Sequence, residues 1–222
     1  YRRFKHMHQA AQIIVDHHSG VFPDTYQALI ALPGIGEYSA GAIMSIAFNQ
    51  PVSATDGNVI RVISRVFNID KDMRVEKHKK EIKAINQAYI KDANPSIYTQ
   101  SMMELGALIC KPKQPMCHRC PLKEDCQAYQ LDKQERLPTL SKKAKKKLIQ
   151  YKTFVIVDGE DIYLRRRTEL LLGGMYEFPQ YEGEIPFEYD VLEIYENIKH
   201  VFTHLIWVMM VYKVRLESKP LG

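Results

Sequence analysis

Hydrophobic residues in the first part of the chain recur at intervals of three and four, the spacing of an amphipathic helix. The pattern is clearest in FKHMHQAAQIIVDHH, AGAIMSIAF, NVIRVISRVF and HKKEIKAINQAYI. Turn signals such as FPDT, LPGIG, NQP and NPS separate these segments. We therefore expect residues 1–129 to form an all-α domain.

The hydrophobic period changes near residue 151. The segment KTFVIVDGEDIYLRRR predicts two strands joined by a turn at Asp158-Gly159, and HVFTHLIWVMMVYKVRL predicts one long strand or two. Residues 151–222 are thus expected to form a β-rich domain. Between the two domains, ERLPTLSKKAKKKLIQ is polar and rich in lysine, which is typical of a linker, here residues 130–150.

Charge follows the same division of the chain. Residues 1–128 carry 16 Lys and Arg against 12 Asp and Glu, residues 129–150 carry 7 against 2, and residues 151–222 carry 8 against 12. The first domain and the linker are therefore basic, which suits a polyanionic partner, although a solvated surface would give the same count.

The sequence also bears on the cellular location of the protein and on whether the chain is a fragment. No apolar run approaches the length of a membrane span, and residue 1 already lies in a basic helical pattern, so we expect no signal peptide and no membrane partner. The expected location is the reducing cytoplasm, where disulfides are disfavoured. The lack of an initiator Met suggests a fragment.

All four cysteines lie in the stretch CKPKQPMCHRCPLKEDC, with the spacing C-x6-C-x2-C-x5-C. Structural zinc sites usually use two separated C-x2-C pairs, whereas four thiolates on short loops suit a compact 4Fe–4S cluster. Structural zinc and a pair of disulfides remain the alternatives. The candidate metal ligands are Cys110, Cys117, Cys120 and Cys126.

A second signal is LPGIGEYSAGAI, residues 32–43. Pro33 favours a tight turn, the following glycines relax the backbone, and a helix is expected to start near Tyr38. Free backbone N–H groups beside a helix start bind phosphate, so a hairpin of this kind grips one DNA strand without reading its bases. A plain helix C-cap is the alternative. The candidate DNA-binding residues are Leu32, Gly34 and Gly36.

A third signal is ATDGNVIRV, which begins about twenty residues after Gly36. Asp56 stands directly before an amphipathic helix, with Asn58 close by. For an isolated Asp, this position is typical of a helix N-cap. The order of hairpin, Asp and four-cysteine loop makes a functional carboxylate the stronger interpretation.

These motifs together resemble the helix-hairpin-helix DNA glycosylase superfamily. The chain looks closest to the MutY family of adenine DNA glycosylases, which act on adenine opposite 8-oxoguanine. The segments LPGIGEYSAGAIMSIAF, DGNVIRVISRVF and MMELGALICKPKQPMCHRCPLKEDC carry the resemblance, and LLGGMYEFPQ and HVFTHL continue it. It covers nearly the whole chain.

The resemblance implies a catalytic role for Asp56, which would stabilise an oxocarbenium-like sugar, with Asn58 holding the local geometry and Tyr38 lining the pocket. Relatives similar to endonuclease III have a Schiff-base lysine where this chain has Tyr38, so a monofunctional glycosylase that leaves an abasic site is expected. The family's general-acid Glu, in a motif like EVMLQQT, is not found. By the same resemblance, residue 1 falls in a GLGYYSR-like segment and the β-rich domain ends before its last strands and helix, so the chain looks truncated at both ends. This fragment itself is a candidate for an inactive form.

The β-rich domain resembles the Nudix-like C-terminal domain of the same family, here partial and expected to be α+β. In the family a loop of this domain recognises 8-oxoguanine, and the matching residues here are Phe202, Thr203 and His204. The local sequence pattern alone predicts that Phe202 lies in the core and that His204 lies in a turn. A metal-binding REUxEE helix is not found, so pyrophosphatase activity is not expected.

The implied cofactor is a 4Fe–4S cluster. The implied partner is double-stranded DNA with an A:8-oxoguanine or A:G mispair, bound by a monomer in a bacterial cytoplasm. Two alternatives stay open: a bifunctional glycosylase/lyase like endonuclease III, and a non-catalytic iron–sulfur DNA-binding fragment.

Overall fold

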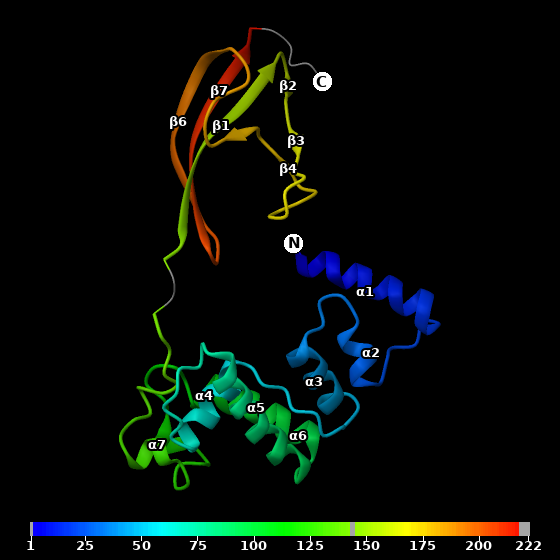
Figure 1. The fold of residues 1–222 in the computed structure, drawn as a ribbon, viewed down its shortest axis with the longest axis vertical. Coiled ribbons are helices and arrows are strands. Elements are labelled where there is room, and N and C mark those ends of the chain that lie inside the picture. Colours follow the sequence, from blue (N-terminus) through cyan, green and yellow to red (C-terminus); the bar gives the residue numbers. More distant parts are fainter. Residues whose placement is uncertain (1, 143–144, 218–222) are drawn as a thin grey trace. The chain divides into compact units, whose positions relative to one another are not determined.

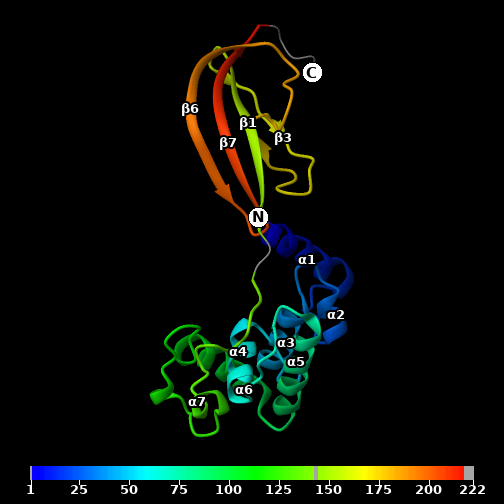
Figure 2. The same cartoon turned by 60° about the vertical axis from the view of Figure 1, so that its left-hand side comes forward.

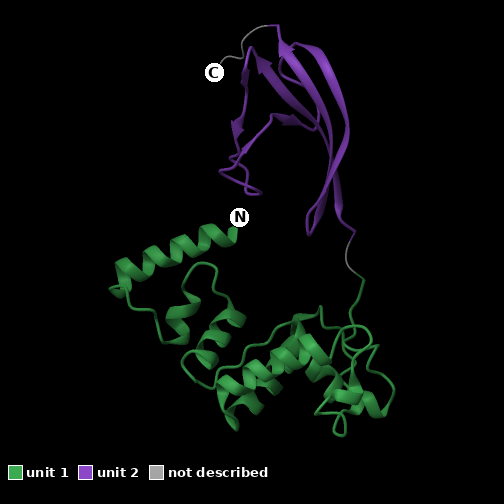
Figure 3. Ribbon diagram, turned by 180° about the vertical axis from the view of Figure 1, so that it is seen from behind, with its two compact units in different colours: residues 1–142 green, residues 143–222 purple. Residues whose placement is uncertain are grey.

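A computed structural model of the chain describes residues 2–142 and 145–217. The chain forms two compact units, residues 1–142 and residues 143–222 (Figure 3). The division falls inside the segment 130–150 that we expected to be a linker. Residues 143 and 144 of that segment lie outside the described part of the chain.

The first unit is built from helices, and its described residues contain no strand (Figure 1). This agrees with the helical periodicity of the sequence. The helices are α1 (Arg2–His18), α2 (Tyr26–Ile30), α3 (Glu37–Ile46), α4 (Gly57–Val66), α5 (Glu76–Lys91), α6 (Pro95–Glu104), the π-helix η1 (Leu105–Ile109), the 3-10 helix η2 (Cys117–Arg119) and α7 (Gln127–Gln130).

The core of the helical unit consists of two hydrophobic clusters. One joins α4 to α5 and contains Val59, Ile63, Met73 and Ile82, all at most 3% exposed. The other joins α2 to α3 and contains Leu29, Ala40 and Met44. The pairs Ala40/Met44 on α3 and Val59/Ile63 on α4 lie four positions apart, so the stripe seen in the sequence is the buried face of these helices.

The second unit is built around three long strands that lie side by side (Figure 2). The strands are β1 (Lys147–Asp158), β7 (Leu205–Leu216) and β6 (Tyr189–Val201). β1 pairs with β7 in parallel, and β7 pairs with β6 antiparallel. The short strands β2 (Asp161–Ile162) and β5 (Gln180–Tyr181) both pair with β1, and β3 (Arg165–Arg166) pairs with β4 (Tyr176–Glu177) in a separate ladder.

The strand predictions are confirmed, with one shift of boundary. The turn at Asp158-Gly159 joins β1 to β2, and Gly159 has a φ of +63°. The segment HVFTHLIWVMMVYKVRL contains two strands, the end of β6 and all of β7. β1 begins at Lys147, four residues before the expected boundary, because residues 147–150 pair in register with residues 205–208 of β7.

The core of the second unit is aromatic. Phe154 is fully buried, and four rings surround it with centroids 5.0–6.1 Å away: Tyr181, Phe187, Tyr189 and Tyr212. We expected an α+β domain here, and this was wrong for the part of the unit that the structure describes, which contains strands and no helix. Across the described residues of the whole chain, no helix has the length and apolar character to cross a membrane.

Candidate active site and cysteine pocket

The hairpin between α2 and α3 has the geometry that a phosphate contact needs. Gly34 has a φ of +83°, a region that favours glycine, and Gly36 is the N-cap of α3. Neither glycine donates a backbone hydrogen bond to another described residue, so both N–H groups are free. A Cβ on Gly34 would lie 2.8 Å from the Cβ of His6, so α1 packs directly behind the turn.

Leu32 does not share this exposure. Its side chain is 3% exposed, so it contributes to the hairpin by anchoring it in the core, while its neighbours in the turn present their backbone. A buried apolar anchor beside two glycines holds a fixed backbone curve without covering the N–H groups. In this hairpin, the buried Leu32 side chain anchors the turn, and two backbone amides remain accessible.

Asp56 is the N-cap of α4, as the alternative interpretation of the sequence allowed. Its Oδ1 accepts the backbone N–H groups of Asn58 and Val59, both at 2.8 Å, and its Oδ2 accepts from Asn58 Nδ2 at 2.9 Å. Each carboxylate oxygen has about two lone pairs, so the cap leaves acceptor capacity on the half-buried group. A fixed carboxylate at a helix start is thus available to a ligand.

Tyr38 lines an open pocket together with Ser53, Thr55 and Gln87. Its ring is 42% exposed, and its hydroxyl contacts the sulfur of Met103 at 3.9 Å. Asp56 is not among the residues that line this pocket, although Thr55 directly before it is. The structure therefore brings Tyr38 to the segment that carries Asp56 without placing both side chains in one cavity.

Asn58 connects the capped end of α4 to the segment before the cysteines. Its Oδ1 accepts from Arg61 Nη2 at 2.8 Å, and Arg61 also donates to the carbonyls of Gly106 and Cys110, both at 2.7 Å. Burial lowers the pKa of the Arg61 guanidinium. A Cβ on Gly106 would lie 2.6 Å from the Cβ of Asn58, so only glycine lets the π-helix η1 approach this closely.

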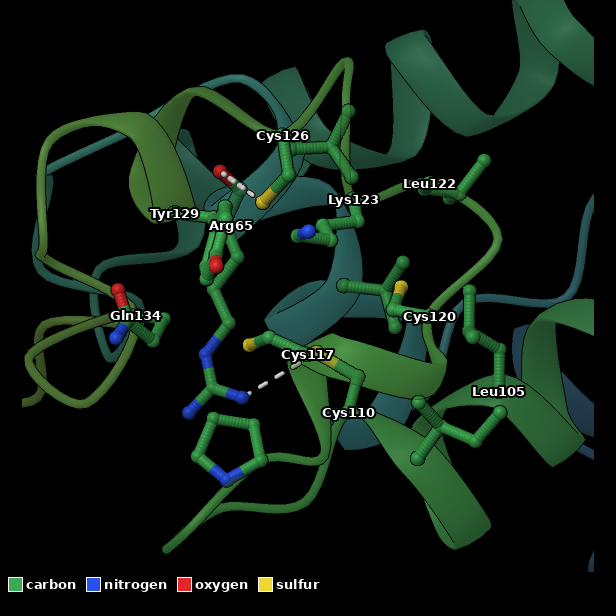
Figure 4. Close-up of a pocket in the computed structure, with 14 residues that line it drawn as sticks. Arg65, Leu105, Cys110, Cys117, Cys120, Leu122, Lys123, Cys126, Tyr129 and Gln134 are labelled. Carbon is green, nitrogen blue, oxygen red and sulfur yellow. Dashed lines mark hydrogen bonds between the residues drawn. The ribbon is translucent and has the colours of Figure 1, made fainter.

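All four cysteines are free and line one apolar pocket (Figure 4). Their side chains come from the end of η1, from η2 and from the loops around it, and they point toward a common space. Among the described residues no group of three or more His, Cys, Asp or Glu is arranged as a ready ion site. Burial raises the pKa values of the Cys117 and Cys120 thiols, with neighbouring thiols as a further cause for both.

Arg65 is the buried cation of this pocket, which Lys123 also lines. Its side chain is 1% exposed, and its guanidinium donates to Cys110 Sγ at 3.2 Å and to the carbonyls of Lys111, Pro112 and Leu137 at 2.7–3.1 Å. The Cys126 thiol in turn donates to the Arg65 carbonyl at 3.5 Å. No carboxylate pairs with Arg65 among the described residues.

A buried guanidinium that lacks an anionic partner is costly, since burial removes the solvation of its charge. Here the groups nearest to it are neutral carbonyls and a thiol. Thiolates bound to a metal centre would supply the missing negative charge. The residues around the pocket therefore fit a cysteine-held metal group better than they fit four neutral thiols.

The turn between β6 and β7 holds the three residues assigned to lesion recognition. The ring of Phe202 packs against His200 and Trp207, with centroids 4.4 Å and 4.7 Å apart, whereas Thr203 and His204 are exposed. Phe202 is only partly buried, so it serves the local packing and still borders the surface. Two of the three side chains thus face solvent.

Our reading of the sequence missed the two arginines of α4. Arg61 and Arg65 stand four residues apart on a helix whose other buried residues are aliphatic except for Ser64, and both are at least 92% buried. The available signal was the position of two charges on the predicted core side of NVIRVISRVF. Such charges need buried acceptors, and the loop before and around Cys110 supplies them.

Known proteins resemble this chain in sequence. The profile of the helix-hairpin-helix motif matches residues 17–46, which contain the hairpin described above. An adenine DNA glycosylase of Buchnera aphidicola subsp. Acyrthosiphon pisum is 35% identical over 187 residues, which cover 83% of this chain and 53% of that protein. The adenine DNA glycosylases of Schizosaccharomyces pombe and Homo sapiens are 40% and 38% identical over 59% and 62% of this chain, and 28% and 25% of those proteins.

A solved structure of a thermostable thymine-DNA glycosylase is also similar, with a TM-score of 0.46 and 24% identity over 57% of this chain and 58% of that one. The chain thus spans about half, or less, of the length of these relatives. Residues 17–46 therefore carry a helix-hairpin-helix motif, and the hairpin between α2 and α3 lies within it. In sequence the chain is similar to the adenine DNA glycosylases.

Proposed function

We propose that this chain is part of a base excision repair enzyme that removes adenine from a mispair in duplex DNA. The observation that carries the proposal is a fixed carboxylate, Asp56, at the start of α4, in a chain whose relatives are adenine DNA glycosylases. The reaction is hydrolysis of the N-glycosidic bond and leaves an abasic site. The preferred mispairs are A:8-oxoguanine and A:G.

The DNA strand is held by the hairpin. The free N–H groups of Gly34 and Gly36 are suited to phosphate oxygens, and the positive end of the α3 dipole adds to the attraction. Glu37 in the first turn of α3 would oppose an anion, but Lys83 pairs with it at 2.7 Å. This contact positions the strand and carries no sequence information.

Asp56 acts on the sugar. As the bond to adenine breaks, the sugar gains oxocarbenium character, and a nearby carboxylate stabilises that cation. Asn58 holds one oxygen of Asp56, so the carboxylate meets the sugar in a fixed orientation. Tyr38 lines the neighbouring pocket and has no amine for an imine, so cleavage of the DNA strand is not part of the reaction.

The four cysteines hold a 4Fe–4S cluster, which supplies a rigid, negatively charged link between the loops that carry them. Two features support this assignment: the spacing of the cysteines, and a buried Arg65 beside their thiols that pairs with no carboxylate in the described part of the chain. Zinc is the alternative, because four thiolates also suit that ion. The number of iron and sulfide ions per chain separates the two.

The second unit reads the base opposite adenine. We assign it as part of a Nudix-like domain on the resemblance of LLGGMYEFPQ and HVFTHL, and we assign lesion contacts to Phe202, Thr203 and His204. The exposed Thr203 hydroxyl both donates and accepts hydrogen bonds, and the His204 ring presents two nitrogens. The domain boundaries we propose are residues 1–129, 130–150 and 151–222.

The test is release of adenine from four duplexes that carry A:8-oxoguanine, A:G, A:T or G:C at one position. Alkali after the reaction reveals abasic sites, and borohydride during the reaction traps any imine. The proposal expects abasic sites on the first two duplexes only, without a trapped adduct.

A trapped adduct would favour the bifunctional glycosylase/lyase. Binding of the mispaired duplexes without base release would favour a non-catalytic iron–sulfur DNA-binding fragment. Equal release from A:T and A:8-oxoguanine would refute the proposed role in mispair repair.

A further inference from the structure

We propose that Lys146 is a positioning residue for the turn formed by Phe202, Thr203 and His204. The inference rests on the proposed function, in which this turn reads the base opposite adenine. Lys146 lies in the basic segment that leads into the sheet unit, just before β1 begins at Lys147. With this role for Lys146, the basic segment before β1 would belong to the part of the unit that contacts the base opposite adenine.

The contact is direct. The Nζ of Lys146 donates a hydrogen bond to the backbone carbonyl of Phe202 at 2.6 Å. The next residue, Lys147, donates its backbone N–H to the carbonyl of His204 at 3.2 Å. Two successive lysines therefore hold both ends of the three-residue turn, one by its side chain and one by its backbone.

The two sides of the turn are held differently. On the ring side, Phe202 packs on Trp207, which is 6% exposed and lies under the guanidinium of Arg167, 5.2 Å from the ring centroid. On the carbonyl side, the Phe202 oxygen receives the exposed ammonium of Lys146. The interior thus fixes the ring, and Lys146 fixes the carbonyl that directly precedes Thr203.

A backbone hydrogen bond also closes the turn. Phe202 donates its N–H to the carbonyl of Leu205 at 2.9 Å, which closes the loop between β6 and β7. Between these two residues, Thr203 and His204 have exposed side chains. Their orientation follows the peptide planes on either side, so a fixed Phe202 carbonyl restricts where the Thr203 hydroxyl and the His204 ring point.

Loss of this contact has a distinct consequence. A turn with a free Phe202 carbonyl samples more conformations, and binding must then order it at an entropic cost. That cost falls on contacts to the opposite base and leaves phosphate contacts made elsewhere unchanged. A lysine that only attracted DNA phosphates would act on every duplex equally, and its effect would weaken as the salt concentration rises.

Lys145 provides the matched control. It carries the same charge, is equally exposed, stands one residue away, and makes no side-chain hydrogen bond within the described part of the chain. Lys145→Met and Lys146→Met remove the same charge and keep most of the aliphatic stem. Lys146→Arg keeps a donor that reaches the same carbonyl.

The experiment measures equilibrium binding of the 222-residue chain to duplexes with A:8-oxoguanine or A:G, at two salt concentrations. Lys146→Met is expected to lower the ratio of the two affinities by about threefold to tenfold, the size of an ordinary hydrogen bond. Lys146→Arg should restore most of the ratio. Lys145→Met should weaken binding to both duplexes alike, more at low salt.

Two results would overturn the inference while the proposed function stands: wild-type protein prefers 8-oxoguanine and Lys146→Met keeps that preference, or Lys146→Met and Lys145→Met act alike on both duplexes. If wild-type protein makes no distinction between the duplexes, or binds neither, the proposed reading role fails and the inference fails with it. Melting curves of all variants check that the sheet unit remains folded.

Discussion

The two units bury different kinds of side chain. Below 2% exposure the helical unit holds Arg65, Asn86 and Ser45, each with hydrogen-bond partners, beside its aliphatic residues, whereas the largest fully buried residue of the sheet unit is Phe154 in a ring of aromatic side chains. Buried polar groups need matching partners, and these partners fix geometry more tightly than apolar contacts do. Hydrogen bonds in the helical unit therefore hold its side chains at the fixed positions that a reaction needs. In the sheet unit, the packed aromatic core supports a turn at the surface.

Arg65→Met removes the largest fully buried polar side chain of the helical unit. Three carbonyls and the Cys110 sulfur lose their donor, so we expect a loss of about 3 kcal/mol or more in the free energy of unfolding of the helical unit. Iron content should fall as well. Chemical denaturation and iron analysis measure the two effects.

Arg65→Lys is the matched control for that variant, because it keeps the charge and loses the planar fork that reaches several acceptors. It should fall between wild type and Arg65→Met. Equal iron and equal stability in all three proteins would mean that Arg65 does not support the cysteine pocket.

Phe154→Ala tests the other unit. The side chain is fully buried among aromatic rings, so its truncation should cost about 3–5 kcal/mol in the stability of the sheet unit. The iron content of the purified chain should not change. A fall in iron as large as that of Arg65→Met would contradict the separation of the two cores.

Tyr98→Phe removes one hydrogen bond from the buried polar network around Asn86 in the helical unit. Tyr98 donates to Asn86 Oδ1 at 2.8 Å, and Asn86 in turn donates to the carbonyl of Ala54 and the hydroxyl of Thr55, directly before Asp56. A buried acceptor without its donor costs about 1–3 kcal/mol. We expect a loss of this size in urea denaturation.

The same residue gives a pH dependence. Burial, with Tyr89 as a smaller cause, raises the pKa of Tyr98 to about 12. The neutral phenol is therefore the form that the fold prefers, and its contribution to stability is complete below pH 10 and is lost as the pH rises through 12. The stability difference between wild type and Tyr98→Phe should shrink over that range, and a constant difference would refute the assignment.

Ile194→Thr should have the smallest effect. Ile194 lies on β6 at the edge of the sheet with 60% of its surface exposed, and Thr is also a favourable strand residue. The expected change in the free energy of unfolding is within about 0.5 kcal/mol. A cost near that of Phe154→Ala would show that another part of the protein covers this strand.

Local pattern predicted much of this molecule. The three- and four-residue period located α1, α3, α4 and α5, and the position of Asp56 directly before an amphipathic stretch predicted its place at the helix start. The cysteine spacing predicted four thiols around one space, and they line one pocket. Each of these features depends on neighbours within a few residues along the chain.

The features that the sequence did not predict depend on distant contacts. Arg65 finds its acceptors more than 40 residues away, so its inward direction could not be read from α4 alone. The early start of β1 at Lys147 depends on its pairing with Leu205. The absence of a helix from the described part of the sheet unit contradicts an expectation drawn from family resemblance.

The central claim is that Asp56 performs chemistry in addition to capping α4. Asn caps helices as well as Asp does, so Asp56→Asn should keep the fold and the affinity for a duplex with A:8-oxoguanine. Asn lacks the negative charge that stabilises the sugar cation, so the rate of adenine release under single-turnover conditions should fall by about 100-fold or more. Release at the wild-type rate by the folded, DNA-bound variant would show that Asp56 is a helix cap alone.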